Sequence, residues 1–134
     1  MVFDNKRAPA ETTPAIRDYK DLQVWQKGME LAKRVYRLTK NFPAEEKFGL
    51  VSQMRRAVVS IPSNLAEGHA RNTTGEFVQF ISHAQGSLAE LDTQCRLSVT
   101  LGFCNDADTE PVSLLITELQ KMLKGLRRKL GPSP

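Results

Sequence analysis

The chain has 134 residues, of which 40% are hydrophobic and 25% are charged, and it contains 8 Gly and 7 Pro. This length supports one compact core, and the composition excludes collagen-like, low-complexity and wholly disordered chains. The net charge is +4, a mild excess that is compatible with a polyanionic partner.

The sequence contains no segment that indicates a membrane-spanning or secreted protein. No apolar run approaches the roughly 18 residues that cross a bilayer, and the first residues lack the apolar centre of a signal peptide. Cys95 and Cys104 lie too far apart along a predicted helix to form a disulfide. We therefore expect a cytoplasmic protein with reduced cysteines and no membrane partner.

The ends of the chain differ from its middle. Residues 1–18 carry prolines and balanced charges without periodicity, which predicts a disordered leader, and residues 131–134 predict a frayed tail. Residues 19–130 contain four stretches with the apolar period of an α-helix and no strand-like alternation.

The first predicted helix runs from about Leu22 to Lys40, with Asp21 as its N-cap. Its apolar residues cover about half of the helix surface, more than a single core requires. This surplus predicts a second buried contact, most simply with another copy of the chain.

The second predicted helix runs from about Ala44 to His69 and contains Pro62. An interior proline removes a hydrogen bond and usually kinks a helix, but the apolar period keeps its phase through this residue. The pattern favours one kinked helix. Its outer face is predicted to admit close approach of a second copy through Val59, Pro62, Ala66 and Ala70.

The last two predicted helices have recognisable starts. Thr73 and Glu76 form a predicted capping box for a helix that continues to about Leu101. The fourth helix is predicted to begin near Asp108, with Pro111 in its first turn. Four antiparallel helices joined by short turns predict an all-α, up-down-up-down four-helix bundle.

A polar stripe on the second helix faces a matching flank on the third. An antiparallel hairpin would bring Arg56 within reach of Glu90. A hydrogen-bonded network that fixes the helix register is the favoured interpretation, and a polar functional site inside the bundle is the alternative. The predicted network comprises Arg56, Ser60, Asn64, Glu67, Ser87 and Glu90.

No pattern of catalytic or metal-binding residues stands out. No glutamate is followed three residues later by histidine, which excludes di-iron chemistry, and His69 and His83 are not expected to converge. Glycine-rich phosphate loops and nucleophile elbows are missing from the sequence. Ser87 and His83 share a helix face, but no orienting acid accompanies them. We expect no enzyme activity, no metal and no cofactor.

The positive charge is concentrated on the first helix and on the end of the fourth. If these helices are neighbours in the bundle, their cations form one basic surface that is a candidate for nucleic-acid binding. The alternative is that cations near helix ends and on outer faces serve stability and solubility only. The candidate residues are Lys27, Lys33, Arg34, Arg37, Lys121, Lys124 and Arg128.

Three runs of sequence carry a resemblance to a known family. They are YKDLQVWQKGMELAKRVYRLTKNFP, GLVSQMRRAVVSIPSNLAEGHAR and EFVQFISHAQGSLAELDTQ, and the block from Arg55 to Gly68 is the most specific. The chain resembles, over about residues 19–104, the four-helix-bundle proteins encoded in intervening sequences of bacterial large-subunit rRNA genes. Gly28 stands where alanine is common in that family.

The resemblance implies a homo-oligomer, a ring of five subunits. It also implies a fold similar to the accessory variability determinant of diversity-generating retroelements, a basic ring that engages nucleic acid and a reverse transcriptase.

Two functional hypotheses remain. The favoured one is a nucleic-acid-binding accessory protein that contacts the backbone of RNA or DNA, and the alternative is a protein-binding scaffold or assembly module. The sequence suggests no exposed aromatic residue apart from Phe103. Base stacking on the protein is therefore not expected.

Overall fold

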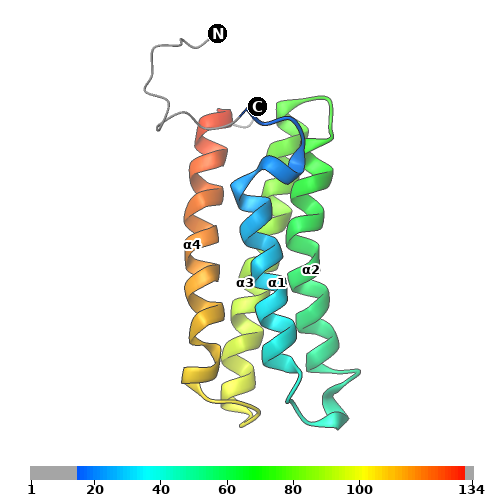
Figure 1. Ribbon diagram of the computed structural model, residues 1–134, viewed down its shortest axis with the longest axis vertical. Helices are drawn as coiled ribbons and strands as arrows, with labels where there is room; N and C mark the ends of the chain where they lie inside the picture. Colours follow the sequence, from blue (N-terminus) through cyan, green and yellow to red (C-terminus); the bar gives the residue numbers. More distant parts are fainter. Residues whose placement is uncertain (1–14, 132–134) are drawn as a thin grey trace.

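The computed structural model describes residues 15–131, and these form an antiparallel bundle of four helices (Figure 1). Two short 3-10 turns, Tyr19–Asp21 and Ala44–Glu46, precede the first and second helices. The all-α prediction is confirmed. Most of the predicted leader and tail lies outside the described residues. The helices are α1 (Gln23–Thr39), α2 (Leu50–His69), α3 (Thr74–Thr100) and α4 (Asp106–Leu130).

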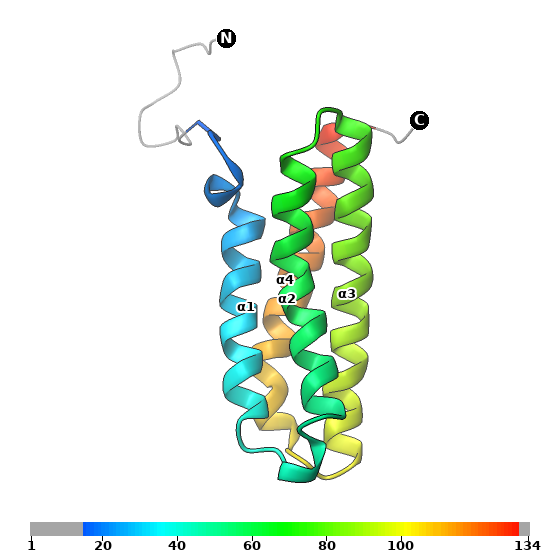
Figure 2. The same cartoon turned by 90° about the vertical axis from the view of Figure 1, so that its right-hand side faces the viewer.

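The four helices close into a ring of neighbours around one core. Each helix packs against the next along the chain, and α4 returns to contact α1 (Figure 2). Deeply buried leucines from all four helices meet on the bundle axis, and full burial of each contributes about 1.5–3 kcal/mol. They include Leu31, Leu65, Leu88, Leu91, Leu119 and Leu123.

The start of α1 differs from the prediction. Leu22 is the N-cap residue and supplies no side-chain hydrogen bond. Asp21 instead closes the preceding 3-10 turn, where its carboxylate accepts hydrogen bonds from the backbone amides of Arg17 (2.8 Å) and Asp18 (3.3 Å). Asp21 is therefore a capping residue of the segment before α1, because Asp18 and Asp21 form a reciprocal capping box there.

The second helix begins later than predicted but runs through its proline. Residues Ala44–Glu46 form a 3-10 turn, and Gly49 is the N-cap of α2. Pro62 lies inside one helix, as predicted. It is buried and packs against Gly28 of α1, where an added Cβ would lie 3.4 Å from the proline ring. Pro62 therefore faces a neighbouring helix of its own chain, which corrects its placement on the outer face.

The α2 and α3 helices approach each other most closely at Gly68. A Cβ atom added there would lie 2.6 Å from Cβ of Phe80 and 3.0 Å from a ring carbon of Phe77. Thr73 caps α3 by accepting a hydrogen bond from the amide of Glu76 at 3.1 Å, but the predicted capping box is only half formed, because the Glu76 carboxylate accepts from the Thr73 hydroxyl at 3.1 Å and not from its amide. The absence of a side chain at Gly68 thus allows α2 and α3 to pack closely next to the turn that joins them.

The last helix begins earlier than predicted. Asn105 is its N-cap and forms a reciprocal capping box with Asp108. Pro111 consequently lies in the second turn of α4, and the helix continues through it to Leu130.

Candidate nucleic-acid interface

The predicted cations of α1 divide into paired and unpaired groups. Lys27 forms an ion pair with Glu118 of α4 at 3.3 Å, and Arg34 pairs with Glu30 on its own helix at 3.4 Å. Lys33 and Arg37 are exposed, and neither forms an ion pair within residues 15–131. The free positive charge of α1 therefore lies on its outer face.

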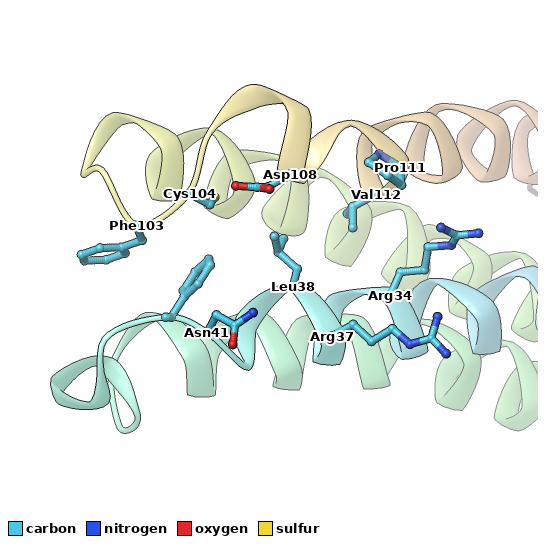
Figure 3. Close-up of a pocket in the computed structure, with 10 residues that line it drawn as sticks. Arg34, Arg37, Leu38, Asn41, Phe103, Cys104, Asp108, Pro111 and Val112 are labelled. Carbon is cyan, nitrogen blue, oxygen red and sulfur yellow. The ribbon is translucent and has the colours of Figure 1, made fainter.

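Arg34 and Arg37 border a cleft of about 310 Å³ between the second half of α1 and the start of α4. In Figure 3 their guanidinium groups lie at one end of the cleft and Phe103 lies at the other. Asp108 also lines the cleft, but its carboxylate accepts the capping hydrogen bond from the amide of Asn105 at 3.0 Å. Arg34 is already paired with Glu30, so the cleft offers one guanidinium group without an ion pair among the described residues, that of Arg37.

The cations of α4 do not join those of α1. Lys121 and Lys124 line a groove on the α3 side of α4, together with Asp92 and Arg96. Arg128 follows Lys124 by one helical turn and shares that side. The three predicted cations of α4 thus lie apart from those of α1, because α4 turns toward the start of α1 a different stripe, which includes Met122, Leu126 and Lys129.

The predicted polar network narrows to one contact between helices. The hydroxyl oxygens of Ser60 and Ser87 lie 2.6 Å apart and form a hydrogen bond between α2 and α3. Arg56 and Glu90 line the same groove, but both are exposed and no ion pair joins them within the described range.

The two remaining members bond within α2 and to the turn that follows it. The Asn64 amide donates to the Ser60 carbonyl at 2.7 Å, and Glu67 pairs with Arg71 at 3.6 Å. Neither side chain therefore links the helices as the sequence prediction required.

Substitutions in this groove separate the half-buried contact between serines from the exposed charges. We expect Ser87→Ala to lower the free energy of unfolding by about 1 kcal/mol, because the hydroxyl of Ser60 loses its partner on α3. Glu90→Ala should change it by less than about 0.5 kcal/mol, because exposed charges contribute little. Urea denaturation of both variants checks this ordering, and a larger loss for Glu90→Ala would contradict it.

The cysteines and histidines of residues 15–131 include a buried thiol and two imidazole rings that pack against phenylalanines. No cluster of three or more potential metal ligands occurs there. Burial raises the pKa of Cys95 to about 12, so this thiol stays protonated near neutral pH and is a poor nucleophile. His69 packs against Phe77 and His83 against Phe80, each with ring centroids 5.8 Å apart.

The aromatic residues contradict the expectation drawn from the sequence. Phe103 is half-buried and packs against Phe42, with ring centroids 5.7 Å apart. Phe48, in the turn before α2, is 89% exposed, and Tyr36 on α1 is 43% exposed. Sequence reasoning missed Phe48 because an apolar residue in a turn carries no periodic signal, and it missed Tyr36 because the apolar period groups this residue with the buried side of its helix. The exposed aromatic rings thus lie on α1 and in the turn before α2.

These features define a four-helix bundle with surface grooves and a basic outer face on α1. Among the described helices none is long and apolar enough to cross a membrane. The family model for the 23S rRNA-intervening sequence protein matches residues 20–125. The chain belongs to this family, which confirms the resemblance seen in its sequence.

A solved structure shares the fold. It is a protein with unknown function from the S23 ribosomal protein family of Bacteroides thetaiotaomicron, and it superposes with a TM-score of 0.70 at 21% sequence identity. The similarity covers 78% of this chain and 97% of that chain. No match was found among curated proteins.

Proposed function

We propose that the protein is a non-enzymatic, homo-oligomeric accessory protein of the cytoplasm that binds RNA or DNA through the phosphate backbone. The observation that supports this function is the outer face of α1, defined here as Lys33, Arg37 and Lys40. All three side chains are exposed, and none forms an ion pair within residues 15–131. Their charge is therefore available to phosphates.

Self-assembly would strengthen this binding. The surface of one chain leaves large apolar side chains exposed, including Met29 at 48%, Leu101 at 54% and Leu114 at 64%. Exposed apolar surface of this kind favours contact with another protein surface. A ring of five copies, as the family resemblance implies, would repeat the α1 outer face and make individually weak phosphate contacts effective together.

A protein-binding scaffold is the second candidate function. The same exposed leucines favour it, because they offer apolar contacts to a partner other than a copy of the chain. In this case the charge of α1 would maintain solubility only.

A binding titration with matched charge variants tests the proposal. The first variant replaces Lys33, Arg37 and Lys40 with glutamine, and the control replaces Lys121, Lys124 and Arg128, so that both lose the same charge. We expect wild type to bind labelled RNA and duplex DNA with an affinity that falls steeply with salt, by a slope of about −0.7 to −0.9 per phosphate contacted. The first variant should lose affinity and salt dependence far more than the control.

Two outcomes would contradict the proposal. An absence of binding to either polymer at low salt removes nucleic-acid binding and leaves the scaffold. Equal losses of affinity in both variants would show that nucleic acid does not bind preferentially to the outer face of α1, and they would contradict the role proposed for that face. Light scattering of the same samples reports assembly, and a mass near 15.0 kDa would remove the oligomer.

A further inference from the structure

A groove outside the α1 outer face combines aromatic and cationic side chains. It encloses about 640 Å³ between α1, the turn before α2, and α2 itself. Apolar Val51 and Val59 contribute to its lining, and no acidic side chain does. The residues that carry the inference are Tyr36, Lys47, Phe48, Arg55 and Arg56, which together are called the Phe48 groove.

Phe48 presents a nearly free ring to this groove. The side chain is 89% exposed, the largest exposure among the large hydrophobic residues described. Lys47 places its ammonium group 5.5 Å from the ring centroid. A ring so exposed gains free energy when a flat apolar surface covers it, and the adjacent cation favours a surface that carries negative charge.

Arg55 is held in place before any ligand arrives. Its guanidinium lies over the Tyr36 ring, 4.4 Å from the centroid, and its Nε donates to Oγ1 of Thr39 at 2.9 Å. Thr39 is itself buried, so this anchor is rigid. A fixed guanidinium loses little conformational entropy when it binds a phosphate.

More cations surround this fixed group. Arg56 is exposed and forms no ion pair in the part of the chain that the structure describes. On α1, Lys33 and Lys40 lie three residues before and four residues after Tyr36, so helical spacing places them beside its ring. The positive charge of α1 therefore continues onto α2 across this groove, and not onto α4.

We propose that the Phe48 groove binds an unpaired nucleotide of a single-stranded nucleic acid, with the base stacked on Phe48 and neighbouring phosphates held by Lys47, Arg55 and Arg56. A nucleotide carries a flat base and a phosphate in every repeat, and single-strand-binding proteins pair aromatic rings with cations for this reason. In a duplex the bases are already stacked and paired, so their faces cannot cover the Phe48 ring.

Charge disfavours a two-fold contact between copies as the occupant, and a ring contact, which would bring a different surface of the neighbour to the groove, is tested below by light scattering. Two copies meeting through this groove around a two-fold axis would bring the same cations face to face, and no acid in the lining would neutralise them. An acidic segment of another protein satisfies the cations, but its carboxylate side chains have no extended aromatic face to cover the ring. These two occupants are outcomes of the test below.

The inference rests on the proposed function, and its test uses the full chain with two probes. Fluorescence anisotropy measures binding of a single-stranded oligouridine of roughly 12 nucleotides and of a duplex of equal length. We expect Phe48→Ala to weaken single-strand binding about tenfold and to leave duplex binding unchanged. Phe48→Trp should restore the single-strand affinity, because tryptophan also stacks. Arg56→Gln should reduce the salt slope by about 0.7.

Controls separate stacking from general loss of apolar surface. Leu97→Ala removes an exposed apolar side chain on α3 and should leave both affinities unchanged. The thermal midpoint of Phe48→Ala should match wild type, because the lost ring is exposed.

The outcomes distinguish this inference from the proposed function. If neither probe binds wild type, the proposed function fails and the inference fails with it. If both probes bind but Phe48→Ala changes nothing, only the inference is overturned. A lower mass by light scattering for Phe48→Ala assigns the ring to contact between copies and overturns the inference. Binding of polyglutamate that depends on Phe48, without binding of oligouridine, overturns it in favour of an acidic protein partner.

Discussion

Replacing Gly68 with alanine is expected to lower the free energy of unfolding by about 2 kcal/mol, although alanine is the better helix former. The added Cβ would lie 2.6 Å from Cβ of Phe80, closer than two carbon atoms can approach. Relief requires α2 and α3 to move apart, and overpacking of this kind costs about 1–3 kcal/mol. Thermal unfolding should show a fall in midpoint of roughly 5–10 °C.

Gly86 provides the matched control for this substitution. It also lies inside a helix, but an added Cβ meets nothing within 4 Å. Gly86→Ala should therefore stabilise the protein by up to about 1 kcal/mol through helix propensity alone. A Gly68→Ala variant as stable as the Gly86→Ala variant would show that the helices do not approach closely at Gly68.

Replacing Gly28 with leucine is expected to cost about 3 kcal/mol. An added Cβ at this position already lies 3.4 Å from both Cβ and Cδ of Pro62, so the further carbons of leucine must displace the proline ring. The ring cannot rotate away, because it is closed onto the backbone of α2. Urea denaturation measures the loss of stability.

A double-mutant cycle tests whether the cost arises from this contact. Pro62→Ala removes ring atoms that face Gly28, so leucine at position 28 should cost at least about 1 kcal/mol less in that background. Gly28→Ala alone should change stability little, because a Cβ at 3.4 Å is in ordinary contact and alanine favours the helix. Equal costs of Gly28→Leu in both backgrounds would place the strain elsewhere.

The fold was accessible from sequence because local patterns and packing agree. Apolar periodicity identified four helices, and Thr73 marked the start of α3 correctly. The predicted starts of α1 and α2 were wrong, because other residues act as the N-caps of these helices. Asp21 precedes the apolar period of α1, but its carboxylate bonds backward to Arg17, and Gly49 delays the start of α2. Such choices depend on backbone geometry that a linear pattern does not contain.

The candidate site was less accessible, because it depends on contacts between helices. Composition located the charge of α1 but did not reveal that Lys27 pairs with Glu118 across the bundle. The rotation of α4 about its own axis places Lys121 toward α3. A small difference in that rotation would place the same residue toward another helix, and the sequence pattern does not fix it. Gly28 and Pro62 were each noticeable in the sequence, but only packing shows that one accommodates the other.

The antiparallel topology also fixes where the protein can be tethered. An even number of helices returns the chain to its starting end, and Figure 1 shows the first turn and the end of α4 at the same end of the bundle. The turn that carries Phe48 lies at the other end, across the 20 residues of α2, or about 30 Å. A fusion partner or surface anchor attached near either described end would lie at the end of the bundle opposite the turn that carries Phe48, and it would leave the Phe48 groove accessible.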